Sequence, residues 1–229
     1  MFERDLINKA AVLTLVMTLS VVPLRAADDD VERALTEVRT RAGRGDAIAQ
    51  HTLASILYYG ADDLQQAIDW FRKAAAQADA DAEFQLGQIY EFGFGMPADD
   101  REALTWYRRA AEHGSSTAQR TVGDHYRRGR AVTMDDVEAV RWYQRAASGD
   151  DLRAQVQLGQ AYLNGTGIGR DNQMAYLWFA VAAGQTPLPD NREAIIEMRN
   201  IAAARMTPEE ESSAARRAAE WRPTARVAR

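Results

Sequence analysis

Apolar and small residues in the middle of the chain recur at helical spacing, in segments of two alternating kinds. In the first kind, represented by residues 82–90, alanine, leucine, glycine and tyrosine stand at positions i, i+4, i+5 and i+8, on one face of a helix. In the second kind, represented by residues 103–111, alanines and a Trp-Tyr pair stand at i, i+3, i+4, i+7 and i+8. The pattern therefore predicts alternating amphipathic helices.

The pair of helices repeats with a period of 36 residues. Residues of one type recur at this step in several registers: Trp70, Trp106, Trp142 and Trp178; Asp99, Asp135 and Asp171; Gly87, Gly123 and Gly159; Tyr90, Tyr126 and Tyr162; Gly93, Gly129 and Gly165. Two helices of this size cannot bury both apolar faces alone, whereas stacked pairs bury a continuous core. We therefore predict an all-α array of stacked helix–turn–helix repeats.

The period also predicts the domain organisation. We expect an N-terminal capping helix at residues 28–45, four repeats over 46–184 (about 46–79, 80–114, 115–149 and 150–184), a C-terminal helical cap at 188–221 and a basic tail at 222–229. In the fourth repeat Ala180 and Val181 replace Arg108 and Arg109 of the second. Because that helix has lost its polar face, the C-terminal cap should cover it.

Glycines recur in two helical registers. Gly87, Gly123 and Gly159 stand inside first helices, where glycine costs about 1 kcal/mol relative to alanine. We therefore expect a neighbouring helix to approach too closely for a Cβ atom there. The second helices should end at a glycine in three successive repeats, at Gly114, Gly149 and Gly184.

The loop of the fourth repeat, "YLNGTGIGRD" (residues 162–171), looks like a phosphate-binding loop, but a helix precedes it where such a loop needs a strand. Its glycines at 165 and 167 occupy repeat positions at which the chain reverses direction. Ala131 takes the place of the second of these glycines in the third repeat. Phe92 and Arg128 stand where the fourth repeat has Asn164, so we interpret the Asn-Gly-Thr glycosylation pattern as incidental.

Acidic residues precede the second helices at the spacing of a capping box. The pairs are Asp99 with Glu102, Asp135 with Glu138, and Asp63 with Gln66. In such a box the first side chain accepts from a backbone N–H of the first turn, and the second side chain returns the bond. We predict capping boxes here, and a metal site at these pairs is the alternative interpretation.

These residues resemble the Sel1-like repeat family, whose unit reads A-x-x-x-L-G-x-x-Y-x-x-G-x-G-x-x-x-D-x-x-x-A-x-x-W-Y-x-x-A-A-x-x-G. Residues 82–114, "AEFQLGQIYEFGFGMPADDREALTWYRRAAEHG", match that pattern almost throughout, and residues 154–184 match it nearly as well. The resemblance implies a right-handed α-solenoid similar to tetratricopeptide arrays, with first helices lining a concave face. Proteins of this family mostly serve as interaction scaffolds, in bacteria often in the envelope.

Composition excludes several classes of function. The net charge of −5 argues against a nucleic-acid partner, whose binding domain would usually be basic. The chain has no cysteine, which excludes a disulfide scaffold, a cysteine nucleophile and a thiolate metal site.

The first residues are typical of an export signal. Lys9 precedes an apolar run over residues 10–24 that is shorter than the roughly 20 apolar residues of a spanning helix. We predict a signal peptide at residues 1–26 and a periplasmic mature protein. The alternative is an uncleaved inner-membrane anchor at residues 10–24, and only then would a membrane be a partner.

Signatures of catalysis are missing from the sequence. It contains no Walker lysine motif, no S-x-x-K, no G-x-S-x-G and no H-E-x-x-H. The histidines, His51, His113 and His125, fall in different repeats and share no ligand spacing. We therefore expect no catalytic, cofactor-binding or metal-binding residue, and no cofactor.

The binding surface should lie where the repeats differ, since positions that vary while the core stays constant are free to contact a partner. Glutamines there could hydrogen-bond an extended peptide backbone. The candidate partner-binding residues are His51, Phe84, Gln85, Gln88, Arg120, Asp124, Gln157 and Gln160.

The sequence thus predicts an exported, non-enzymatic scaffold that binds a protein or peptide partner in the bacterial cell envelope. One alternative is an envelope regulator that restrains a membrane sensor kinase. Another is a β-lactam-binding hydrolase, because some cysteine-rich relatives of the repeat family have that association; the absence of cysteine and of a serine-lysine motif argues against it.

Overall fold

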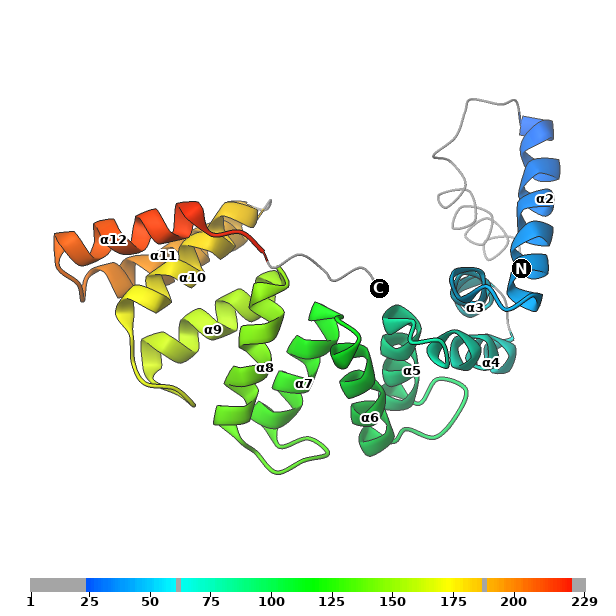
Figure 1. Ribbon diagram of the computed structural model, residues 1–229, viewed down its shortest axis with the longest axis horizontal. Helices are drawn as coiled ribbons and strands as arrows, with labels where there is room; N and C mark the ends of the chain where they lie inside the picture. The colour runs from blue at the N-terminus through cyan, green and yellow to red at the C-terminus, as the bar shows by residue number, and fades with distance from the viewer. Residues whose placement is uncertain (1–23, 61–62, 187–188, 224–229) are drawn as a thin grey trace. The chain divides into compact units, whose positions relative to one another are not determined.

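The computed structural model describes residues 24–60, 63–186 and 189–223, and every regular element in that part of the chain is an α-helix (Figure 1). The helices are α2 (Leu24–Gly43), α3 (Ala47–Gly60), α4 (Leu64–Ala75), α5 (Ala80–Phe92), α6 (Asp100–Glu112), α7 (Ser116–Arg128), α8 (Asp136–Ser148), α9 (Leu152–Asn164), α10 (Asn172–Gln185), α11 (Pro189–Ala203) and α12 (Pro208–Glu220). The prediction of an all-α repeat fold is confirmed.

Parts of the predicted ends fall outside the described residues. They comprise residues 1–23 of the predicted signal peptide, with nearly all of the alternative anchor, and residues 224–229 of the basic tail. Among the described helices, none combines the length and the hydropathy needed to cross a membrane.

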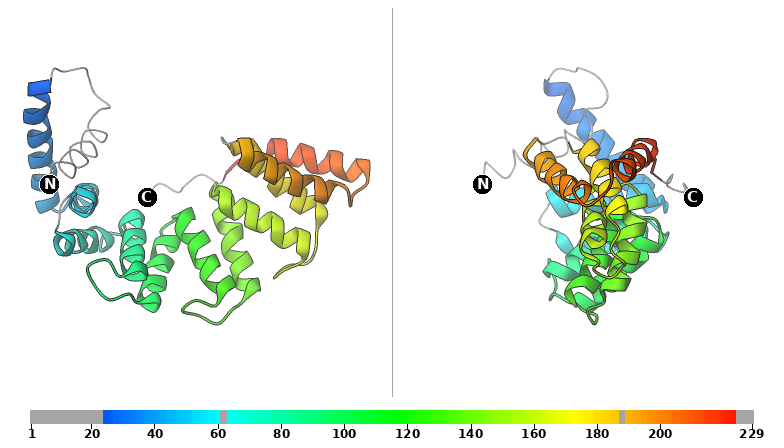
Figure 2. Two further views of the ribbon diagram at one scale, coloured as in Figure 1. Left: turned by 180° about the vertical axis from the view of Figure 1, so that it is seen from behind. Right: turned by 90° about the vertical axis from the view of Figure 1, so that its left-hand side faces the viewer.

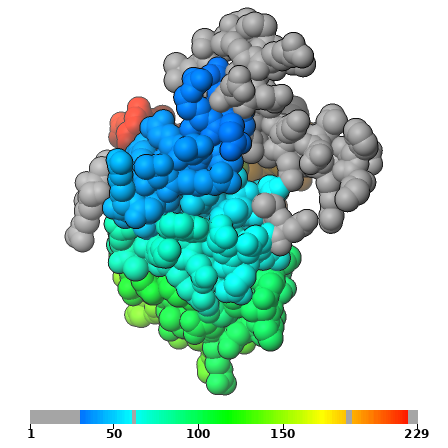
Figure 3. Space-filling model, turned by 90° about the vertical axis from the view of Figure 1, so that its right-hand side faces the viewer, coloured from blue at the N-terminus to red at the C-terminus, as the bar shows by residue number. Residues whose placement is uncertain are grey.

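The chain divides into two compact units, residues 1–106 and 107–229, and each is described by itself. In unit 1, α2 packs on α3 and on Trp70 of α4 through a small cluster around Ala42 and Leu53. A second cluster joins α3, α4 and α5 around the fully buried ring of Phe71. Figure 3 shows α2 to α4 as one continuous surface, coloured blue to cyan. The predicted N-terminal capping helix therefore covers the first helix pair.

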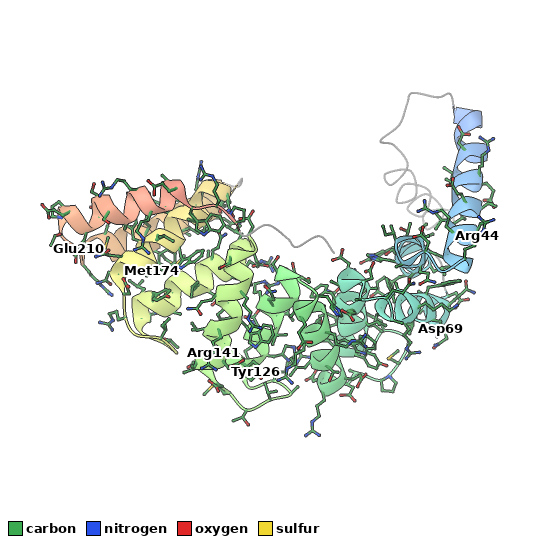
Figure 4. The ribbon with its side chains drawn as sticks, viewed as in Figure 1. Arg44, Asp69, Tyr126, Arg141, Met174 and Glu210 are labelled. Atoms are coloured by element: carbon green, nitrogen blue, oxygen red, sulfur yellow. The ribbon has the colours of Figure 1, made fainter. Side chains whose placement is uncertain are left out.

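In unit 2, α11 and α12 pack on α10, as the two views of Figure 2 also show. Phe179 and Ala182 of α10 share one buried cluster with Ile195 of α11 and Ala214 of α12. This is the apolar helix whose lost polar face required a cover. Glu210, labelled in Figure 4, closes a capping box with Thr207 at the start of α12.

The close approach expected at the internal glycines is confirmed at two positions of unit 2. A Cβ atom on Gly123 would lie 2.7 Å from the ring of Tyr143, and one on Gly159 would lie 2.7 Å from the ring of Phe179. Ordinary contacts of a Cβ atom begin at about 3.4 Å. Each glycine thus allows the aromatic ring of the second helix to rest against the backbone of the first helix.

A hydrogen bond at the tyrosine register joins each pair to the next within both units. Arg72 donates to the hydroxyl of Tyr90 (3.1 Å), Arg108 to Tyr126 (2.6 Å) and Gln144 to Tyr162 (3.5 Å). Donors and acceptors both advance by 36 residues. Tyr126 is labelled in Figure 4. The recurring tyrosine is thus also a polar link between successive helix pairs.

A second polar link involves a glutamine register that the sequence analysis did not single out. The side-chain amide of this residue donates to a carbonyl at the end of the preceding second helix: Gln50 to Ala42 (3.2 Å), Gln119 to Ala111 (3.0 Å) and Gln155 to Ala147 (3.4 Å). Helix ends leave such carbonyls without an intrahelical partner. The 36-residue step from Gln119 to Gln155 was the signal that could have revealed it.

The predicted capping boxes are half correct. Asp63, Asp99 and Asp135 cap their helices by accepting from backbone N–H groups of the first turn. The return bond to the cap's own N–H does not form at the last two, because that N–H donates instead to the carbonyl of Tyr90 or Tyr126 across the loop. The backbone hydrogen bond that closes the loop therefore uses the N–H group that a capping box would require.

The predicted glycine stops are correct in position after α6 and α8, at Gly114 and Gly149, and wrong at Gly184. Gly114 has a φ of +92°, as a left-handed helix stop requires. At the end of α8, however, Gly149 has a φ of −85° and Asp150 takes the left-handed conformation, with a φ of +70°. Gly184 lies inside α10, which continues to Gln185. The stop is therefore set by the position in the repeat and tolerates other residue types.

We predict that Ala131→Gly stabilises the protein. Ala131 has a φ of +63°, in the register where Gly95 and Gly167 have +72° and +67°. Relief of this conformation gains about 1–2 kcal/mol, which exceeds the entropy cost of a new glycine, about 0.4–1 kcal/mol. The free energy of unfolding from urea denaturation should rise by about 0.5–1 kcal/mol.

The matched control is Gly167→Ala, which should lower the free energy of unfolding, because its Cβ would overlap the carbonyl oxygen of Asp136. A destabilised Ala131→Gly variant would show that the left-handed turn costs alanine nothing here.

Candidate functional site

The first register of predicted binding residues lies at a junction between helix pairs. Nδ1 of His51 on α3 lies 3.4 Å from Oδ1 of Asp79, the N-cap of α5. Arg120 on α7 pairs with Asp151, the N-cap of α9, with 3.3 Å between Nε and Oδ1. Within each unit, this register therefore contacts the start of the next first helix.

Arg120 and Asp124 belong to a half-buried polar network in unit 2. Arg120 pairs with Asp124 at 3.0 Å, and Asp124 accepts a 2.8 Å hydrogen bond from the hydroxyl of Tyr143. That hydroxyl also accepts from Nε of Arg127 at 3.1 Å. Burial, and then the nearby Asp124 carboxylate, raise the pKa of Tyr143 well above its ordinary value. Both predicted residues thus bind other side chains of the same unit.

Gln157 and Gln160 line a cavity of about 200 Å³ between α8 and α9. Arg127 and Asn164 add polar groups to its wall, while Ala139 and Val140 are buried and apolar. The amide of Gln160 also lies 3.4 Å from the sulfur of Met198 on α11. Pockets for small molecules are usually larger, about 300–1,000 Å³, so this cavity is smaller than a usual small-molecule site.

The remaining predicted residues, Phe84, Gln85 and Gln88, lie half-buried on α5 of unit 1. The amide of Gln85 donates to the hydroxyl of Tyr59 on α3, at 3.4 Å. Gln88 stands one turn and Phe84 two turns before Phe92, so they share a face of α5 with it. The three residues therefore lie next to a group of aromatic side chains at the C-terminal ends of α3 and α5.

We call Tyr58, Tyr59, Phe92 and Phe94 the aromatic cluster. Ring centroids are 4.8 Å apart between the two tyrosines, 6.2 Å between Tyr58 and Phe94, and 5.7 Å between the two phenylalanines. Tyr58 also contacts the buried ring of Phe71 at 6.2 Å. Tyr59, Phe92 and Phe94 are 62%, 58% and 44% exposed. The cluster thus rests on the core and presents three large apolar side chains to solvent.

The repeat shows that the fold does not require these exposed aromatic residues. The position just before the first loop glycine is occupied in successive repeats by Tyr59, Phe92, Arg128 and Asn164, and all four are exposed. The position of Phe94 holds Arg130 and Thr166 in the later repeats. The change from Phe92 to Arg128 and Asn164 is visible in the sequence and was the signal that could have revealed the cluster. Exposed apolar groups of this kind mark interaction sites.

No group of three potential ligand side chains that could hold a metal ion occurs among the described residues. His125 is buried, and its Nδ1 lies 3.0 Å from the carbonyl oxygen of Arg130, a contact within its own loop. The acidic cap residues bind backbone N–H groups, as described above.

Comparisons with known proteins agree with the repeat. A family model for the Sel1 repeat matches residues 47–79, 80–115, 116–151 and 152–186, more than half of the 229 residues. The chain is similar to a protective antigen present in uropathogenic Escherichia coli strains that displays an SLR fold, with 28% identity over 96% of this chain and a TM-score of 0.70. It is also similar to a Sel1 repeat protein from Oxalobacter formigenes, with 30% identity over 73% of this chain and a TM-score of 0.67.

The chain spans 45% of the first of these solved structures and 49% of the second, which is less than half of each. No curated protein matches it.

We predict that Tyr143→Phe lowers the free energy of unfolding by about 1–2 kcal/mol, because Asp124 and Arg127 each lose a hydrogen bond. Ring packing should persist, since Phe179 rests on Gly159 in the same register without a hydroxyl. Urea denaturation followed by circular dichroism measures the change. Tyr162→Phe, which loses only a 3.5 Å bond from Gln144, is the control and should change little. Equal losses in both variants would rule out the network as the source of the effect.

Proposed function

This chain belongs to the Sel1 repeat family, and from that premise we propose that it is an exported scaffold that binds a protein or peptide partner in the bacterial cell envelope. Sel1 repeats generally mediate protein–protein interaction, and proteins built from them are typically non-enzymatic scaffolds. The export, the location in the cell envelope and the binding surface are the parts that we add.

The aromatic cluster is the observation that supports this proposal most directly. Its three exposed side chains occupy positions that are polar in the third and fourth repeats, so folding alone does not account for them. Aromatic residues are enriched at protein interfaces and dominate binding energy there. A stack of rigid helix pairs presents such a surface already formed, which lowers the entropy cost of binding.

Half-buried side chains beside the cluster add hydrogen-bonding groups. Gln85 and Gln88 on α5 carry amides that can donate to and accept from a peptide backbone. The apolar run at residues 10–24, followed by small residues at Ala26 and Ala27, supports export of the mature chain.

We predict that a photo-reactive benzophenone amino acid at position 92 cross-links the chain to its partner in intact cells. Phe92 is 58% exposed, so an aromatic replacement there should not disturb the fold. The control is the same amino acid at position 137, because Val137 is 50% exposed in unit 2. We expect a distinct adduct, identified by mass spectrometry, from position 92 only. The same adducts at both positions, or none, would contradict the proposed binding function.

We also predict that the chain isolated from cells begins at Ala27 and is found in the periplasmic fraction. Intact mass measurement of the full-length gene product gives the cleavage position. A product that retains residues 1–26 and stays with the membrane would support the anchor instead, and one that remains in the cytoplasm would refute export.

A further inference from the structure

The segment that carries the aromatic cluster is strongly acidic. Residues 47–100 contain nine acidic and two basic residues, so the net charge of this segment is −7, more negative than the −5 of the whole chain. On the helices themselves, α3 has no Asp, Glu, Lys or Arg, and α5 has Asp81, Glu83 and Glu91 but no Lys or Arg. The cluster thus belongs to the acidic segment of the chain, in which Glu83 is buried.

Both basic residues of that segment are already engaged. Arg72 donates to the hydroxyl of Tyr90 and lies 3.5 Å from a carboxylate oxygen of Asp69. The ammonium group of Lys73 lies 3.7 Å from the centroid of the Trp70 ring. The segment therefore retains a net negative charge that its own cations do not offset, and it attracts cations from solution.

The equivalent first helix of the third repeat has the opposite character. In α7, Arg120, Arg127 and Arg128 stand with the single acid Asp124, and Arg128 occupies the register of Phe92. The helices that carry Tyr59 and Phe92, α3 and α5, contain no arginine, whereas α7, which has three arginines, carries Arg128 at the same register. The two features of α5, exposed rings and an excess of acidic over basic residues, thus occur together.

Exposed aromatic faces and negative charge are complementary to one kind of side chain. A guanidinium or ammonium group over an aromatic face gains about 0.5–1 kcal/mol at an exposed site and more when it is desolvated. The carboxylates increase the rate of encounter and disfavour acidic partners. The amides of Gln85 and Gln88 lie on the same face of α5, within reach of the backbone of an extended chain.

We propose that the aromatic cluster and the adjoining face of α5 bind a basic segment of the partner, in extended conformation, with arginine or lysine side chains placed over Tyr59, Phe92 and Phe94. This inference rests on the proposed function and names the chemistry of the partner. The rings supply the contact, and the acidic surroundings select for positive charge.

The test uses the mature chain and three short blocked peptides that share a Gly-Ser backbone and carry arginine, glutamate or proline at the same positions. Isothermal titration calorimetry measures the Kd for each. We expect the arginine peptide to bind, with a Kd that rises with salt concentration, and the glutamate and proline peptides to bind at least about tenfold more weakly.

The variant Tyr59→Asn, Phe92→Asn, Phe94→Thr places at these positions the residues that the fourth repeat already carries, Asn164 and Thr166. It should weaken binding of the arginine peptide by about tenfold or more. Phe92→Asn alone, at a 58% exposed position, is the second variant in case the triple variant unfolds, and it should show part of the same loss. The control variant, Met134→Thr with Val137→Thr, removes two exposed apolar side chains of unit 2 and should leave the Kd unchanged.

Three results would overturn the inference: no binding of the arginine peptide, binding that survives both cluster variants, or equal binding of the glutamate or proline peptide. If the cross-linker at position 92 still yields a partner in any of these cases, the proposal of a basic partner segment is refuted, while the proposed scaffold function stands. If the cross-link is also absent, the scaffold function fails with it.

Discussion

The close contact between an aromatic ring of each second helix and a glycine of each first helix is the constraint on which the rest of unit 2 depends. The ring of Tyr143 lies where a Cβ on Gly123 would be, and Phe179 stands in the same relation to Gly159. Only glycine permits this approach, and only a large flat side chain fills the space that it opens. Given this contact, the other core residues of the pair, such as Ala139 and Leu158, are placed at helical spacing around it. The 36-residue period reflects the repetition of this contact in successive helix pairs.

Once the core registers are occupied, the remaining registers divide into two kinds. One kind links successive helix pairs, through the tyrosine hydroxyls, the buried glutamine amides and the ion pairs made by His51 and Arg120 with N-cap aspartates. Among these, the register of His51 and Arg120 varies between repeats, because each residue must fit its particular neighbour. The other kind faces solvent in every repeat, as the register of Phe92 does. Variation in this second kind is the more informative about binding, because no packing requirement explains it.

The sequence was sufficient to predict the helix pairs, the aspartate caps and the apolar cover of α10, because each follows from local spacing and from the need to bury apolar surface. It was insufficient for Gly149 and Asp150, since which of two adjacent residues takes the left-handed conformation depends on where the helix ends. The capping boxes failed for a similar reason: the N–H of Asp135 is taken by the carbonyl of Tyr126, nine residues earlier, once the loop closes. The predicted binding residues were chosen from variability between repeats and from the hydrogen-bonding capacity of glutamine. Neither criterion could separate the junction register of Arg120 from the exposed face that Phe92 occupies.

The sequence by itself determined the all-α repeat, its period and its core, because periodic apolar residues leave few ways to exclude water from both faces of each helix. Membership of the Sel1 repeat family follows from the same residues. Only the tertiary structure decided which polar side chains are used within the chain, as in the network of Arg120, Asp124 and Tyr143, and which large apolar side chains remain exposed. The physical reason is that exposure and pairing depend on what the neighbouring helix presents at each position. Spacing along one helix carries no information about that.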